Sequence, residues 1–221
     1  MRNWLSYDGV LCQTLGKVTD CLCLSIVWII SCLPIVTVGA ATTALYYTVN
    51  KVVRYGVTGI LREYRRSFAM NFKQSTVLWL VLVLLFGLLA VSSYGSYILY
   101  RAGYLPKAML IFLLVLWAAV TAWALYLFPY LARFHNSTVQ IMQNSLWFAV
   151  CNFPWTVLLL LIFAVTVVGS VLIPMGILLL PAGGMLISSY ILERVFRKYM
   201  SPEDLEAENL RYGNAADEKK A

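Results

Sequence analysis

Charged side chains are scarce in this sequence. Asp, Glu, Lys and Arg make up 12% of the 221 residues, whereas a soluble globular domain carries about 25%. None of the four occurs from residue 134 to residue 192, and hydrophobic residues make up 61% of the chain. This balance does not suit an ordinary soluble domain, and it predicts an integral membrane protein.

Groups that carry catalysis or bind metal ions are scarce too. The chain has one histidine, His135, and the acidic residues Asp20 and Glu193 lie at the edges of apolar runs. No paired carboxylates, zinc-site spacing, phosphate-binding loop or Ser/His/Asp set is present. Ionisable groups are costly inside a bilayer and persist there for function. We therefore expect no enzyme activity, no catalytic residue, no metal site and no cofactor.

The net charge of +7 does not indicate a nucleic-acid partner. The basic residues flank long apolar runs, where they set topology and contact anionic lipid, and no nucleic-acid-binding motif accompanies them. The five cysteines lack the spacing of a redox or zinc motif, and we interpret them as small apolar packing residues. Membrane lipid is thus an expected partner, nucleic acid is not, and the residues name no small-molecule ligand.

The uncharged runs contain five predicted membrane spans, because a helix needs about 20 apolar residues to cross a bilayer and because glycines and Pro174 near residues 169–176 divide the last run in two. The spans are expected at residues 21–43, 76–100, 108–131, 154–172 and 176–194. Pro34 is expected to kink the first span or to end it nearby. Two alternatives stay open there: residues 21–50 cross the membrane once, or they form a re-entrant hairpin.

Two semi-polar segments beside the spans predict amphipathic helices on the cytoplasmic surface, near residues 58–73 and 136–152. The expected fold is an all-α, polytopic transmembrane helical bundle. Residues 1–200 are expected to form a single membrane domain, and residues 201–221 a charged cytoplasmic tail.

The distribution of Lys and Arg predicts the orientation of this bundle. With the N-terminus outside and the C-terminus inside, thirteen of these residues lie on the cytoplasmic side and four outside, as the positive-inside rule requires. If residues 21–50 form a hairpin, the N-terminus moves inside and the rest of the topology is unchanged.

The segment from residue 33 to residue 47 is the first candidate site. It joins a proline break to small residues that let another helix approach closely, and to threonines that satisfy freed backbone groups. The residues proposed for a helix or partner interface are Pro34, Thr37, Gly39, Ala40, Thr43 and Tyr47. The segment suits a kinked, tightly packed helix; the alternative is a broken helix that lines a site.

The second candidate site is the cytoplasmic amphipathic surface, where aromatic residues recur every four positions among basic ones. Its proposed residues are Arg62, Arg65, Arg66, Phe68, Asn71, Phe72, Asn152 and Trp155. This pattern suits a helix that lies on anionic lipid. Docking of a cytoplasmic partner is the alternative.

Three segments carry a resemblance to a known family: residues 33–54, the segment Arg65-Arg66-Ser-Phe…Asn71-Phe72-Lys73-Gln74, and Asn152-Phe153-Pro154-Trp155. Over residues 5–200 or so the chain resembles the YesL-like bacterial integral membrane proteins, known as domain of unknown function 624. The resemblance implies a multi-pass protein of the bacterial cell membrane, in Gram-positive species. Members often accompany carbohydrate ABC importers, and no catalytic residues are established for them.

The leading hypothesis is therefore a non-catalytic accessory membrane subunit that binds or regulates the permease of a carbohydrate ABC importer. The first alternative is a small stand-alone transporter or channel, with a path lined by Thr37, Thr42, Thr43, Ser92, Ser93 or Ser96. The second is a membrane sensor that signals through the tail at residues 201–221.

Overall fold

A computed structural model describes residues 10–54, 59–134, 136–173 and 175–200, together with residues 202, 203, 205 and 206. Most of the predicted tail, 201–221, therefore lies outside the described residues. The described part of the chain forms helices and no strand, which confirms the all-α prediction. The helices are α1 (Val10–Cys32), α2 (Val38–Thr48), α3 (Ile60–Arg101), α4 (Lys107–Arg133), α5 (Thr138–Cys151), α6 (Phe153–Leu172) and α7 (Gly176–Arg197). A 3-10 turn, η1 (Ile35–Thr37), and a π-helix, η2 (Val49–Arg54), flank α2.

Among the described residues, five helices are long and apolar enough to cross a membrane: α1, α3, α4, α6 and α7. This confirms a multi-pass membrane protein with five candidate spans. The predicted spans 108–131, 154–172 and 176–194 begin and end within three residues of α4, α6 and α7. The side of the membrane on which each terminus lies stays a prediction.

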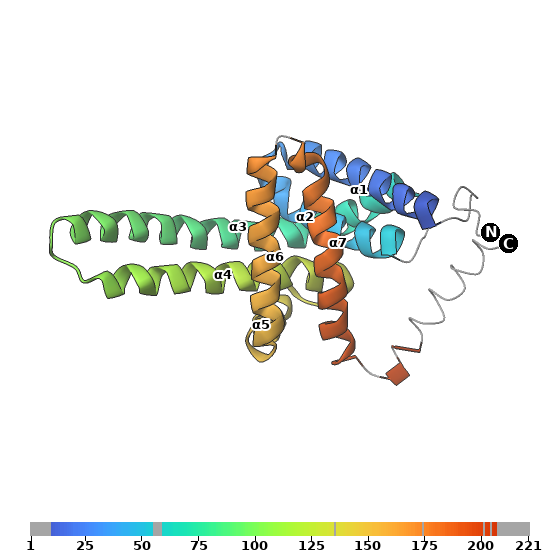
Figure 1. Ribbon diagram of the computed structural model, residues 1–221. Coiled ribbons are helices and arrows are strands. Elements are labelled where there is room, and N and C mark those ends of the chain that lie inside the picture. Colours follow the sequence, from blue (N-terminus) through green and yellow to red (C-terminus); the bar gives the residue numbers. More distant parts are fainter. Residues whose placement is uncertain are drawn as a thin grey trace.

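The first predicted span, 21–43, is wrong at its C-terminal end. Helix α1 ends at Cys32, and the chain turns before α2 begins at Val38. Pro34 disfavours helical backbone in the residue before it and has no N–H to donate. Helix α2 then runs back along α1, so that the indole Nε1 of Trp28 donates to Thr42 Oγ1 over 3.4 Å. Both ends of this hairpin lie on the same side of the molecule (Figure 1), as the hairpin alternative requires.

The amphipathic segment 58–73 and the span 76–100 are not separate helices, as predicted, but one. Helix α3 runs unbroken for 42 residues, a length of about 63 Å. No proline interrupts residues 60–101, so nothing in the chain ends the helix at the predicted boundary. The second amphipathic segment, 136–152, is a separate helix, α5. Ser137 and Gln140 cap its start, and it ends at Cys151, before Pro154 at the start of α6.

The two apolar hairpins cross instead of running side by side. Figure 1 shows α3 and α4 as a long hairpin that projects away from the rest of the chain, with α6 and α7 lying across its base. We call residues 87–116, the projecting part of this hairpin, the arm. Helices α1, α2 and α5 pack around the base. Most of the core therefore lies where the two hairpins cross.

An aromatic cluster holds the ends of α4, α5 and α7 together. The ring of Tyr130 lies 5.7 Å from that of Phe148 and 6.1 Å from that of Phe196. Tyr199 packs edge-on against Phe148, with 4.9 Å between ring centroids. Such edge-to-face pairs stabilise beyond the area they bury. The cluster brings the two charged residues next to it, Arg133 on α4 and Glu193 on α7, to the same place.

Candidate functional site: a buried polar junction

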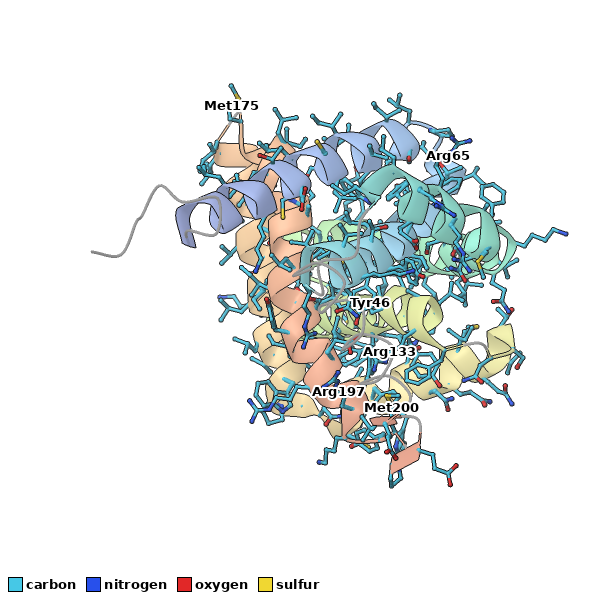
Figure 2. All side chains as sticks on the ribbon, turned by 90° about the vertical axis from the view of Figure 1, so that its right-hand side faces the viewer. Tyr46, Arg65, Arg133, Met175, Arg197 and Met200 are labelled. Carbon is cyan, nitrogen blue, oxygen red and sulfur yellow. The ribbon has the colours of Figure 1, made fainter. Side chains whose placement is uncertain are left out.

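The π-helix η2 places a row of polar side chains against α7. Tyr46, Asn50 and Arg54 recur every four residues along α2 and η2, so they share one face of the helix. In Figure 2, Tyr46 and Arg133 lie close together inside the molecule, well away from Arg65 on its surface. π-Helical turns are rare and often occur at functional sites, which makes η2 the natural place to look for one.

Glu193 is the centre of this arrangement, and its side chain is fully buried. Its Oε1 atom accepts a hydrogen bond from Tyr46 Oη over 2.9 Å and another from Asn50 Nδ2 over 2.8 Å. Its Oε2 atom accepts from Nη1 of Arg133, which forms an ion pair with it. Arg54 extends the network, donating to the backbone oxygen of Ser189 over 3.3 Å. We call these residues the junction.

Both oxygens of the Glu193 carboxylate are engaged in the junction. Burying an ion pair costs several kcal/mol per ion, and this cost is offset only where the geometry is good and the remaining polar atoms have partners. Here both carboxylate oxygens of Glu193, on α7, accept from protein donors on three other elements: α2, η2 and α4. An ionised carboxylate is an acceptor only, so the arrangement suits a fastening between helices.

A second ion pair fastens η2 to the start of α3. Lys51 Nζ lies 2.7 Å from Glu63 Oε2, and it donates to Tyr47 Oη over 3.1 Å. Burial of Lys51 lowers its pKa, but the hydrogen bonds with Glu63 and Tyr47 outweigh burial, and the pKa is raised above its ordinary value. The π-helix η2 is thus bonded to a carboxylate on each of two other helices: Glu193 on α7 and Glu63 on α3. Within the described residues, no group of three or more His, Cys, Asp or Glu side chains is placed to hold a metal ion.

An apolar cavity of about 670 Å³ lies beside the junction, bounded by α1, α2, α3, α4, α6 and α7. Leu45 and Leu192 line it, whereas their chain neighbours Tyr46 and Glu193 belong to the junction. The cavity and the junction therefore share a wall made by α2 and α7.

Comparison with known families identifies the first third of the chain. Residues 21–93 match the family described as protein of unknown function, DUF624. The match covers about a third of the chain. It includes the C-terminal half of α1, all of α2 and η2, and α3 as far as residue 93, which lies within the arm. The YesL-like naming, and the likeness beyond residue 93, stay predictions. Comparisons with curated proteins and with solved structures give no match.

The DUF624 segment contributes part of the junction and both members of the second ion pair. Tyr46, Asn50, Lys51 and Glu63 lie within it, whereas Arg133 and Glu193 of the junction lie outside the matched residues. The family segment is therefore a three-helix unit whose π-helix is anchored by the C-terminal half of the chain.

The first set of predicted site residues lies in this segment, at the contact between α2 and its neighbours. Ala40 and Thr43 are fully buried, and Thr43 Oγ1 lies 3.2 Å from Ser75 Oγ on α3. Gly39 is packed so tightly that a Cβ atom there would lie 2.6 Å from the backbone oxygen of Ser75. Tyr47 accepts the bond from Lys51. Gly39 and Thr43 thus lie at an internal contact between α2 and α3, whereas Tyr47 lies beside the Lys51–Glu63 ion pair.

Pro34 and Thr37 make the turn before α2. Pro34 is exposed. Thr37 Oγ1 lies 2.5 Å from the backbone oxygen of Ser31 and 2.6 Å from that of Pro34. The hydroxyl is thus in reach of the Ser31 oxygen, which the end of α1 leaves without an intrahelical partner, and of the Pro34 oxygen, which also accepts from the backbone N–H of Thr37.

The second predicted set falls on two separate surfaces. Arg62, Arg65 and Arg66 are exposed on α3, where the ring of Phe68 packs 5.6 Å from that of Phe72. Asn71 Nδ2 donates back to the Ser67 backbone oxygen over 3.0 Å. Asn152 is buried at the start of α6 and donates to the Phe148 backbone oxygen over 3.2 Å. Trp155 lies under the guanidinium of Arg194, 5.3 Å away. The structure does not bring the two halves of this set into one site.

The six hydroxyl residues proposed to line a transport path do not lie together either. Thr42 lines the apolar cavity and Thr43 is bonded to Ser75, whereas Ser92, Ser93 and Ser96 lie far along the arm. Ser96 is 21 residues beyond Ser75 on the same helix, which separates them by about 31 Å.

Sequence reasoning missed the junction itself. It placed Glu193 at the edge of an apolar run and gave the residue no role. One signal was available: Arg133 and Glu193 are the charged residues that bound the long uncharged stretch from 134 to 192. Opposite charges at the two ends of such a stretch could have suggested that its helices fold back and pair them.

Proposed function

We propose that this protein is a non-catalytic membrane subunit that binds another membrane protein through the arm. The family resemblance makes the permease subunits of a carbohydrate ABC importer in a bacterial cell membrane the partner to test first. This proposal rests on one observation: the arm presents a long apolar surface that the described parts of the chain do not cover.

The arm carries apolar side chains on its outside along both of its helices. The exposed large residues are Leu88, Val91, Tyr94, Tyr97, Ile98 and Leu99 on α3, and Met109, Ile111, Phe112, Leu114, Val115 and Leu116 on α4. Inside the arm, Leu89, Ser96 and Leu113 are buried. The arm thus has a packed seam of its own and a free apolar exterior.

Lipid could cover a uniform apolar exterior, so a partner needs a further argument. One face of α3 in the arm carries Gly87, Val91 and Gly95 at intervals of four residues, which places them one above another. No other side chain fills this face, because a Cβ atom at Gly87 or Gly95 would have no neighbour within 4 Å. The two glycines, eight residues apart on this face, leave room on either side of Val91 for a second helix to approach in a membrane, and this favours a protein partner.

The junction supports the same proposal from the other end of the molecule. Its carboxylate is engaged by protein donors on both oxygens, so it offers neither a general base nor a binding group. A base whose helices are joined by the junction, and from which the arm projects, suits a protein that binds another protein.

Affinity purification tests this function. A tagged wild-type protein, extracted in mild detergent from cells that express a carbohydrate ABC importer, should bring down the permease subunits. The variant Gly87→Leu should lose at least tenfold of the permease, because it fills the small-residue face of the arm. The control Gly183→Leu makes the same change on α7, where a Cβ atom also has no neighbour within 4 Å, and it should retain the permease. If the wild type captures no permease, or if both variants behave alike, this proposal is wrong.

A further inference from the structure

The cavity beside the junction is large for a protein interior. Protein cores pack to the density of organic crystals and contain few voids larger than a water molecule. A volume of about 670 Å³ falls instead in the range of small-molecule sites, roughly 300–1,000 Å³. The cavity is open on one side, so its apolar lining contacts whatever surrounds the protein there, and an apolar occupant is expected.

Three tryptophans line the cavity, and the indole N–H of each already donates a hydrogen bond within the protein. The indole Nε1 of Trp28 donates to Thr42 Oγ1, that of Trp79 to the Ile35 backbone oxygen over 2.7 Å, and that of Trp117 to Ser93 Oγ over 3.1 Å. What the tryptophans present to an occupant is therefore their apolar ring surface.

The hydroxyl groups of the lining are satisfied in the same way. Four of the five, those of Thr42, Thr121, Thr166 and Ser170, donate to backbone oxygens of their own helices over 2.7–2.8 Å. A buried water molecule needs two to four polar partners, and apolar cavities stay dry. The lining is thus built for an occupant that makes no hydrogen bonds.

The mouth of the cavity opens on an apolar surface. Among the lining residues, Phe163, Val167 and Val171 on α6 and Ile177 on α7 are 43%, 46%, 78% and 47% exposed. Both helices are candidate membrane spans, so their exposed faces are where the hydrocarbon of a bilayer would lie. An occupant that enters through this rim comes from the hydrocarbon.

The size of the cavity restricts the occupant further. A volume of about 670 Å³ is in the range of sites for small apolar molecules or single alkyl chains. We infer that the cavity is a binding site for an alkyl chain of a membrane lipid. The chain lies against the tryptophan rings, and any headgroup stays outside the rim.

Native mass spectrometry of the full-length protein in mild detergent tests this site. Phosphatidylglycerol and stearic acid are added in separate samples, so that the retained mass identifies the source of the chain. The wild type should retain one molecule of at least one of them. The variant Ala124→Trp puts an indole into the cavity and should reduce retention at least tenfold. Its control, Ala118→Trp, makes the same change at an exposed position of α4 outside the lining and should retain the lipid.

A second pair of variants acts at the rim, where folding is less at risk. Val167→Trp narrows the mouth, whereas Val165→Trp changes an exposed residue of the same helix outside the lining. Retention should fall in the first and not in the second. Equal retention in both members of both pairs, or no retained lipid in the wild type, overturns the inference. Neither result bears on permease capture, which depends on the arm.

Discussion

The junction and the arm differ in which side chains they bury and which they expose. In the junction, Glu193 is fully buried and its carboxylate accepts from Tyr46, Asn50 and Arg133, which come from separate elements. In the arm, two helices pack against each other, and most of their large apolar side chains stay exposed. The first region fixes which helices meet. The second leaves a surface free for contact with something else.

The packing around two glycines, one in each region, shows the same contrast between the base and the arm. Gly39, near the junction, lies against the backbone and side chains of α3, whereas Gly87, on the arm, has open space where a side chain would be. One glycine is required by close packing and the other is not. Substitutions in the two regions should therefore differ in size and, for the glycines, in sign.

The largest effect is expected for Glu193→Leu. This change removes the carboxylate that accepts from Tyr46, Asn50 and Arg133, and leaves the charge of Arg133 buried with no carboxylate opposite it. Breaking one side of a buried ion pair costs about 3–5 kcal/mol. Thermal unfolding of the purified protein in detergent should show a loss of this size.

The double variant Arg133→Met with Glu193→Leu is the control for this prediction. Replacing both members of a buried pair with apolar residues is often neutral or stabilising, so the double variant should recover most of the loss. If the double variant is as unstable as Glu193→Leu alone, loss of the ion pair does not explain the destabilisation.

The next effect is expected for Gly39→Ala. The new Cβ atom would lie 2.6 Å from the Ser75 backbone oxygen and 2.8 Å from Trp79 Cβ. Neither is the end of a flexible side chain, so α2 and α3 must move apart. Overpacking of this kind costs about 1–3 kcal/mol. The same unfolding measurement should show the loss, and an unchanged midpoint would mean that the contact between α2 and α3 is looser than the structure shows.

The sequence predicted most of the fold because its strongest signals are local. An uncharged run located α4, and glycine and proline near residues 169–176 divided the longer run 134–192 into α6 and α7, all to within a few residues, since hydropathy and helix breakers are properties of a segment alone. The hairpin of α1 and α2 was left open, because a proline can kink a helix or end it, and the choice depends on what packs beyond it. Helix α3 was divided by its change in composition, although amphipathic and apolar stretches can share one helix.

The candidate site was harder to predict than the fold. Tyr46 and Glu193 are 147 residues apart, and no local pattern joins them. Each charged residue by itself looked like an ordinary residue at the edge of a span. Only the crossing of the two hairpins brings them together, and a crossing is a property of tertiary packing. The residues chosen for their spacing, such as Gly39 and Thr43, lie at a helix contact instead.

A smaller effect is expected at the second fastening of η2, from Lys51→Met. The Lys51–Glu63 pair is partly accessible, with side chains 19% and 11% exposed, so we expect its loss to cost about 1 kcal/mol. The effect should depend on pH with a definite sign. Because folding raises the pKa of Lys51, its contribution is complete below the ordinary lysine pKa of about 10.4. It is lost as the pH rises through the folded-state value.

Unfolding of the wild type and of Lys51→Met should therefore be compared between pH 7 and pH 11. The difference in stability should be constant up to about pH 10 and should shrink above it. The variant Glu63→Gln provides the control, because it removes the charge of the partner and keeps its shape. A difference that shrinks on acidification from pH 9 to pH 7 would contradict the assignment to Lys51.

The smallest effect is expected on the arm, from Gly87→Ala, and its sign is opposite to that of Gly39→Ala. A Cβ atom at Gly87 meets nothing within 4 Å, so the substitution adds no clash. Glycine inside a helix is less favourable than alanine by roughly 0.5–1 kcal/mol, and the variant should gain up to that amount. Unfolding of Gly87→Ala and Gly39→Ala side by side in one detergent makes this the most direct comparison of the two regions. A loss in both would mean that the arm packs against part of the molecule as tightly as α2 does, and its face would then not be free for a partner.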